Sequence, residues 1–260
     1  MKEITYIQFD QARLTVQTIH PNGTRERPSL IFLHHALGSI AQWGDFPEAL
    51  SLRTGLSAVV FERLGHGSSD VPPNPRGMEF FHEEALESLP RLLSELGIEK
   101  PLLIGHSDGA TIALLYAAHF PTSGVIAEAP HVMVESQTLE GICQALTKKQ
   151  DLIKRLEKYH GGKTKELVEC WAGTWLAPWF REWSIEDELP NISCPILILQ
   201  GSADPYGTMM QARSIQLAAG GTVSCFEVPN GGHFLHVQAR DAVLEEMSAF
   251  IRQIVTNQIS

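Results

Sequence analysis

Residues 105–109 of this 260-residue chain read Gly-His-Ser-Asp-Gly, with an apolar run before them and a helix-prone run after them. This pattern is typical of a sharp turn from a strand into a helix, in which the glycines remove clashes and the hydroxyl of Ser107 is held out above a sheet. The N–H of Asp108 would then point from a helix N-terminus toward a developing negative charge. The segment predicts a nucleophilic Ser107, with an ordinary glycine-rich turn as the alternative.

A nucleophilic serine needs a base to take its proton and an acid to orient that base. After a turn of this type, the acid and then the histidine follow the serine along the chain. Asp204 lies in a short loop after the apolar run 196–200, and His233 lies in Gly-Gly-His-Phe after the run 222–228. We predict that Ser107 attacks a carbonyl carbon, that His233 accepts its proton and that Asp204 orients the imidazole.

These assignments have alternatives. Asp204 is also suitably placed for a helix N-cap, and His233 for an ordinary role in a glycine-rich loop. Glu128, at the end of the candidate strand 124–127, is a rival for the acid. We prefer Asp204, because a loop after a late strand is the more usual place for the acid.

The elements that must position these residues alternate along the chain. An N-terminal hairpin is followed by apolar runs typical of buried strands at 29–34, 56–61, 101–105, 124–127, 195–200 and 222–228. Helical patterns occupy 80–96, 110–120, 209–219 and 239–255, and Pro90 should kink the first of them or shift a boundary within it. Strands that alternate with helices predict an α/β fold with a mostly parallel central sheet flanked by helices.

The stretch 132–190 breaks this alternation, because it has helical spacing and no convincing strand. Insertions into α/β sheets lie at the carboxyl ends of strands, where ligands bind. We therefore expect a helical lid at 132–190, inserted into an α/β core formed by 1–131 and 191–260.

Several side chains in and near this lid are candidates for the substrate pocket. Tryptophans recur every four residues from 171 to 183. They form the core of the lid, or Trp175 and Trp179 face the pocket. His35 and His131 are further candidates for the pocket lining. The charged run 148–158 is expected to be a solvated face.

These segments together resemble the α/β-hydrolase superfamily over nearly the whole chain. The resemblance implies an oxyanion hole formed by the backbone N–H groups of Ala36 and Asp108. The chain departs from the family at His35, where glycine is usual. His35 either shapes the pocket or, like His34, bonds to the loop backbone. Serine rather than aspartate at position 107 favours acyl chemistry over dehalogenation or epoxide opening. The matching segments are 33–39 (Leu-His-His-Ala-Leu-Gly-Ser), 61–69 (Phe-Glu-Arg-Leu-Gly-His-Gly-Ser-Ser), 105–109, 201–204 and 232–234.

The composition is that of a globular chain with an acidic surface. Hydrophobic residues make up 43% of the chain, and the net charge is −10. Such a surface repels nucleic acid and anionic lipid, and no run approaches the roughly 20 apolar residues of a membrane span. Without a phosphate-binding glycine loop or metal-ligand spacing, we expect no cofactor and no metal. We expect a cytoplasmic monomer or homodimer that binds a small-molecule substrate, no nucleic acid and no membrane.

The sequence thus predicts a serine hydrolase that cleaves a small, mostly uncharged ester through an acyl-enzyme, as a carboxylesterase does. The same three residues would also support hydrolysis of a C–C bond in ring-fission products, hydrolysis of a lactone or a thioester, or perhydrolysis. A ligand-binding receptor that keeps the fold and turns over slowly is the alternative from another class.

Overall fold

The computed structural model describes residues 1–9, 11–21, 30–72 and 77–259, and within them one sheet has eight strands. The strand order is β1-β2-β4-β3-β5-β6-β7-β8. The β1–β2 and β2–β4 pairs are antiparallel and the other five are parallel, which confirms the N-terminal hairpin and the mostly parallel sheet. The strands are β1 (Lys2–Phe9), β2 (Ala12–Ile19), β3 (Leu30–Leu33), β4 (Ala58–Glu62), β5 (Leu102–His106), β6 (Gly124–Glu128), β7 (Ile196–Gly201) and β8 (Val223–Val228).

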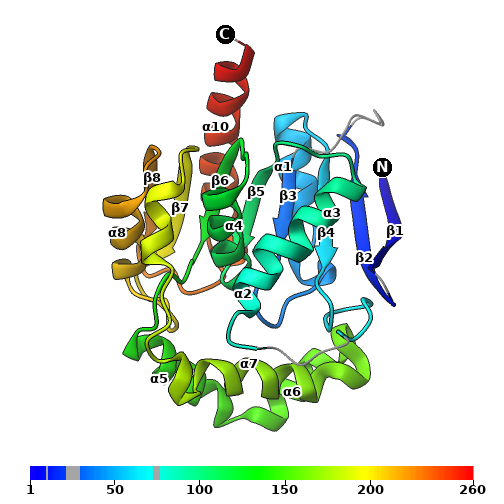
Figure 1. Cartoon of the computed structure of the whole chain (residues 1–260), viewed down its shortest axis with the longest axis vertical. Helices are drawn as coiled ribbons and strands as arrows, with labels where there is room; N and C mark the ends of the chain where they lie inside the picture. Colours follow the sequence, from blue (N-terminus) through cyan, green and yellow to red (C-terminus); the bar gives the residue numbers. More distant parts are fainter. Residues whose placement is uncertain (10, 22–29, 73–76, 260) are drawn as a thin grey trace.

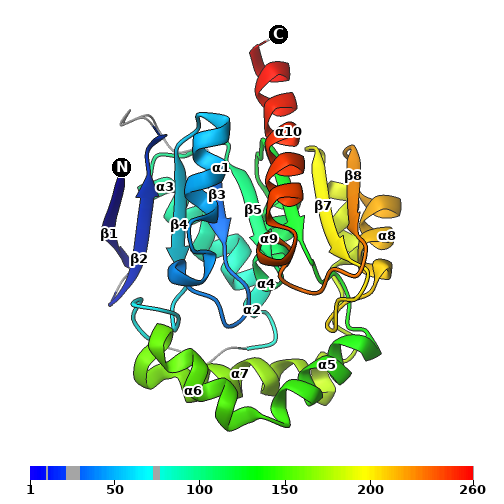
Figure 2. The same cartoon turned by 180° about the vertical axis from the view of Figure 1, so that it is seen from behind.

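Helices cover both faces of the sheet (Figures 1 and 2). One face packs against α1 and α10, and the other packs against α2, α3, α4 and α8. The strands β3 to β7 are buried along their whole lengths, which is why they appear as continuous apolar runs. The helices are α1 (Phe46–Thr54), α2 (Phe80–Glu83), α3 (Leu89–Glu95), α4 (Asp108–His119), α8 (Met209–Ala218), α9 (Leu235–Gln238) and α10 (Arg240–Ile259).

The helical pattern at 80–96 is a contiguous helical run with a boundary next to Pro90, which is one of the two effects expected of that proline. The helix α2 continues into a π-helical turn at Glu84–Ser88, and α3 begins with Pro90 in its first turn. Proline has no N–H to donate to the preceding turn, so the regular hydrogen-bond pattern is interrupted there. The run keeps one direction while its internal bonding changes.

Between β6 and β7 the chain forms a helical insertion made of α5 (Ser136–Leu146), α6 (Lys149–His160) and α7 (Thr164–Trp175). These helices lie together across one end of the sheet (Figure 1). They share a cavity with residues that follow β5, β7 and β8, so they cover the carboxyl ends of those strands. The domain boundaries at 132 and 190 stay a prediction. Among the described residues, every helix is too short or too polar to cross a membrane.

Candidate active site

Ser107 occupies the tight turn between β5 and α4. Its backbone has φ 55° and ψ −119°, a conformation that strains any residue with a Cβ atom. A Cβ atom on Gly105 would lie 2.3 Å from the Gly109 carbonyl oxygen, and one on Gly109 would lie 2.1 Å from the Leu33 carbonyl oxygen. Both glycines of the segment 105–109 are therefore required by close approach of the backbone.

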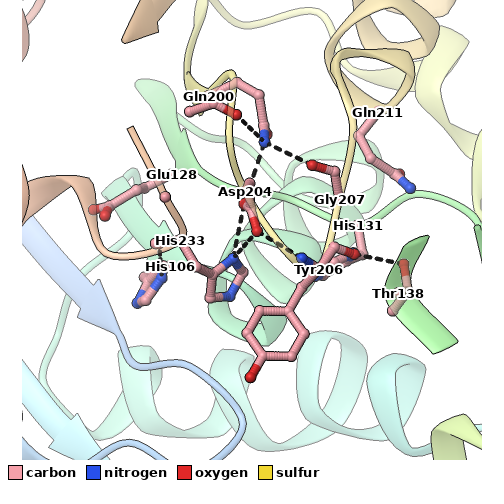
Figure 3. A network of polar contacts seen from close by, with 12 residues as sticks. His106, Glu128, His131, Thr138, Gln200, Asp204, Tyr206, Gly207, Gln211 and His233 are labelled. Atoms are coloured by element: carbon pink, nitrogen blue, oxygen red, sulfur yellow. Dashed lines mark hydrogen bonds and ion pairs between the residues drawn. The ribbon is translucent and has the colours of Figure 1, made fainter. Parts of the chain in front are cut away.

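His233 and Asp204 form a buried pair (Figure 3). The His233 Nδ1 atom lies 2.8 Å from Asp204 Oδ2 and 3.0 Å from Oδ1. Asp204 also accepts hydrogen bonds from Tyr206 N at 2.8 Å and from Gln200 Nε2 at 3.2 Å. Burial by itself would raise the pKa of Asp204, but the charge and hydrogen bond of His233 keep that pKa below its ordinary value. An ionised Asp204 holds the proton on Nδ1, which leaves Nε2 as the basic nitrogen.

A cavity of about 870 Å³ lies between the carboxyl ends of the strands and the helical insertion. Ser107 and His233 both line it. Two residues 126 positions apart are therefore brought to one space, and Asp204 lies directly behind the second of them. A volume of this size accommodates a small organic molecule.

Ala36 and Asp108, the predicted oxyanion donors, line the same cavity. The helical bonds of α4 begin with the N–H groups of Ala110 and Thr111, which donate to the Ser107 carbonyl. The Asp108 N–H lies ahead of them, at the positive end of the helix dipole. The Ala36 carbonyl lies 2.9 Å from His66 Nε2, which fixes the orientation of the loop. The role of both N–H groups stays a prediction.

Comparison with known proteins agrees with this architecture. Residues 30–246 match the model of the alpha/beta hydrolase family. The chain belongs to the alpha/beta hydrolase family. A 3-oxoadipate enol-lactonase of Acinetobacter baylyi is 24% identical over 98% of this chain and 100% of its own length.

Two solved structures show the same fold. The match with proline iminopeptidase of Mycobacterium smegmatis covers 97% of this chain and 98% of that chain, with a TM-score of 0.75 and 16% identity. The match with the carboxylesterase CesB of Bacillus subtilis covers 96% of this chain and 92% of that chain, with a TM-score of 0.72 and 17% identity. At such identities the likeness supports the fold alone.

In this alpha/beta hydrolase, the rival acid Glu128 binds a different histidine. Its carboxylate lies 2.8 Å and 2.9 Å from His236 Nδ1 and accepts the His236 backbone N–H at 3.1 Å. Both residues are buried, and neither is among the residues that line the cavity. Burial by itself would raise the pKa of Glu128, but His236 and His106 bring that pKa down to about 2. Asp204, not Glu128, is the carboxylate that contacts His233.

Within the described residues, the one group placed to approach a metal is His106, Glu128 and His236, whose ligand atoms lie within 4.8 Å of one another. Hydrogen bonds already engage this group. Glu128 holds His236 Nδ1, and His106 Nε2 lies 2.8 Å from the His233 carbonyl oxygen. Burial lowers the pKa of His106 to about 3, so its ring is neutral and donates from Nε2. We interpret the group as a scaffold for the backbone of His233.

Three of the four predicted pocket residues line the cavity: His35, His131 and Trp175. The prediction for Trp179 is wrong, because that side chain is 47% exposed and is not part of the lining. The helix α7 ends at Trp175, and Pro178 begins a separate 3-10 turn, so the four-residue spacing does not continue on one face. Trp171, one turn earlier on α7, lines the cavity instead.

His34 and His35 bond to the loop backbone, as the second interpretation of these residues expected. His34 Nδ1 lies 2.7 Å from the His35 carbonyl oxygen, and His35 Nδ1 accepts from Leu37 N at 3.3 Å. The His35 ring also packs 5.1 Å from the Phe234 ring in the cavity wall. Burial lowers the pKa of His35 well below its ordinary value, so the ring faces the cavity uncharged.

Sequence reasoning missed two neighbours of the His233–Asp204 pair. The Tyr206 ring packs 4.9 Å from the His233 ring and lines the cavity. Gln200 is fully buried at the end of β7 and donates to Asp204 and to the Gly207 carbonyl (Figure 3). A polar residue at the end of an apolar strand was a signal for Gln200, since a buried amide needs partners. No such signal marked Tyr206.

Glu135, at the entrance to the helical insertion, ties the insertion to the loop that carries Asp204. Its carboxylate accepts hydrogen bonds from Thr208 N at 2.9 Å and from Gln211 Nε2 at 2.8 Å. The start of the insertion and the Asp204 loop are therefore held together by a charged group.

Proposed function

We propose that this chain is a serine hydrolase that cleaves a small carboxylic ester through an acyl-enzyme. One observation carries the proposal: Ser107, in its strained turn, lines the same cavity as His233, and Asp204 holds the imidazole from behind. Nucleophile, base and orienting acid are the three parts that acyl transfer needs.

In the proposed reaction, the Ser107 hydroxyl attacks the ester carbonyl carbon while His233 Nε2 takes its proton. Asp204 stabilises the imidazolium, and the N–H groups of Ala36 and Asp108 stabilise the oxyanion. His233 then gives its proton to the leaving oxygen, and the alcohol departs. A water molecule, deprotonated by His233, attacks the acyl-enzyme and releases the carboxylic acid.

The helical insertion would act as a lid over this reaction. Its lining residues on α5, α6 and α7 form the wall opposite the carboxyl ends of the strands. Exclusion of water by such a wall strengthens the electrostatic interactions in the cavity.

Hydrolysis of a lactone is the second candidate. It is favoured by the enol-lactonase of Acinetobacter baylyi, which matches this chain over its full length. The steps are the same, except that the leaving alcohol remains part of the acyl group, so that water releases a single hydroxy acid.

Turnover of 4-nitrophenyl butyrate and of a small lactone tests the proposal. Ser107→Ala should lower kcat by a factor of about a thousand or more on each hydrolysed substrate, because the nucleophile is lost. Ser94→Ala, at an exposed serine of α3, is the matched control and should retain full activity. Ser107→Ala activity equal to that of the control would contradict the proposal.

A further inference from the structure

Three basic side chains line the cavity on the wall opposite Ser107. Lys148 lies just before α6, and Arg155 and Lys158 lie on that helix. The spacings of seven and three residues bring all three onto one helix face. Asp151 is the acidic residue of this helix that lines the same wall. The chain carries a net charge of −10, so a positive wall here runs against the overall charge.

The cations of this wall differ from their neighbour Lys149 in their partners. Lys149, the neighbour of Lys148, pairs with Glu169 at 2.8 Å and does not line the cavity. Among the described residues, by contrast, no carboxylate lies within 4 Å of the charged groups of Lys148, Arg155 or Lys158. The side chains of these three residues are exposed, and the Lys158 Nζ atom lies 4.6 Å from the centre of the Tyr159 ring. The charged run 148–158 is a solvated face, as expected, and part of that face also lines the cavity.

Tyr206 connects this wall to the reacting groups. Its ring packs 4.9 Å from the His233 ring, and it lines the cavity together with Arg155. Burial and Asp204 raise the pKa of the Tyr206 hydroxyl, and the positive charge of Arg155 opposes them. Arg155, Tyr206 and His233 thus all line one cavity. Apolar residues also line this cavity, among them Ile142, Leu152, Leu156, Trp171 and Trp175.

We propose that the substrate carries a carboxylate a few bonds from the reacting carbonyl, and that Lys148, Arg155 and Lys158 bind this carboxylate. The inference rests on the proposed function and replaces the expectation of an uncharged ester. A cavity lined by apolar side chains and by these cations fits a short acyl chain that ends in a negative charge. Arginine suits a carboxylate because its planar donors match the two oxygens.

Binding and turnover of two matched esters test this. The probes are mono-4-nitrophenyl glutarate, which carries a free carboxylate, and its methyl ester, which does not. Calorimetry on Ser107→Ala protein measures Kd without turnover. The anionic probe should bind about tenfold more tightly than the methyl ester. Raising the salt from about 0.05 M to about 0.5 M should shrink this preference, because salt screens exposed charges.

Charge-removing variants in the same Ser107→Ala background locate the effect. Arg155→Gln, alone or with Lys148→Gln and Lys158→Gln, should abolish most of the preference for the anionic probe. Lys154→Gln is the matched control, because Lys154 is an exposed residue of α6 that does not line the cavity, and it should keep the preference. Since all these side chains are exposed, thermal melting should show the same fold throughout.

Equal Kd values for the two probes, or an equal loss of preference in Lys154→Gln and Arg155→Gln, would overturn the inference. Failure of the proposed function looks different. Protein with Ser107 intact would then hydrolyse neither ester, while the Kd ratio in Ser107→Ala protein would still report on the cationic wall.

Discussion

Two buried carboxylate–histidine pairs lie side by side in this chain, with nearly the same contact geometry. Asp204 and His233 meet at 2.8 Å, and Glu128 and His236 also meet at 2.8 Å. At the scale of residues, the difference lies in what the imidazole faces. His233 lines the cavity beside Ser107, whereas His236 packs 4.7 Å from the Trp43 ring in the core. The two pairs therefore differ in surroundings: the Asp204–His233 pair faces the cavity, and the Glu128–His236 pair is part of the core.

Replacing each acid by its amide separates these roles. Asp204→Asn should lower kcat by about 10⁴-fold on a hydrolysed ester, because the amide no longer holds the proton on His233 Nδ1. Glu128→Gln should retain most of kcat but lower the free energy of unfolding by about 2 kcal/mol, the typical loss for a hydrogen bond to a charged group. Steady-state kinetics and urea unfolding measure the two effects. A larger kcat loss in Glu128→Gln would make Glu128 the acid.

The strained backbone of Ser107 gives a second prediction at this scale. Ser107→Gly and Ser107→Ala should both abolish turnover, but only glycine adopts a φ of 55° without strain. The glycine variant should therefore be more stable than the alanine variant by about 1 kcal/mol. Equal urea midpoints for the two variants would show that the turn stores no strain.

At the scale of elements, the site depends on how closely α4 approaches β3. A Cβ atom on Gly109 would meet the Leu33 carbonyl at 2.1 Å, whereas one on Gly173 of α7 would meet nothing within 4 Å. Both glycines lie in helices, so helix propensity favours alanine over glycine at both positions. The two positions differ in how closely other atoms pack against them.

Alanine at these two positions should act in opposite directions. Gly109→Ala should destabilise the fold by about 3 kcal/mol or more, because backbone atoms cannot move aside cheaply. Gly173→Ala should stabilise it by about 0.5–1 kcal/mol through helix propensity. Thermal unfolding of both variants checks this, and a stabilised Gly109→Ala protein would contradict the close packing of α4 on β3.

The sequence predicted most of these elements, because buried strands, glycine turns and helical spacing leave local patterns. The spacing of the tryptophans gave the wrong prediction that Trp179 faces the pocket, because a local period does not show where α7 ends. Tyr206 and the inward side of α6 were missed for a related reason. Which side of a loop or lid helix faces a cavity depends on packing between segments distant in the chain, and a single sequence does not record it.

At the scale of the whole molecule, the site is built on neutral buried histidines. Burial lowers the pKa of His106 and of His131 to about 3. In the unfolded chain these groups titrate near pH 6.5. Below that pH the unfolded state therefore binds protons that the folded state does not bind. Glu128, with a folded pKa of about 2, acts in the same direction below its unfolded value near 4.5.

Stability should therefore fall with pH from about 6.5 downward, by about 1.4 kcal/mol per pH unit for each such histidine. The loss continues until each group titrates in the folded state. Urea midpoints between about pH 7 and pH 4.5 measure the slope. His131→Gln should make the slope shallower by about one proton. A slope unchanged in that variant would mean that His131 is protonated in the folded state.

The proposed function depends on Ser107 being a nucleophile that His233 activates. The most direct measurement is peptide mapping by mass spectrometry after treatment with a fluorophosphonate, which reacts with activated serines. We expect one adduct per chain, on Ser107, with none in Ser107→Ala and strongly slowed labelling in His233→Asn. An adduct on another residue, or an unlabelled Ser107 in protein that still hydrolyses esters, would contradict the proposed function.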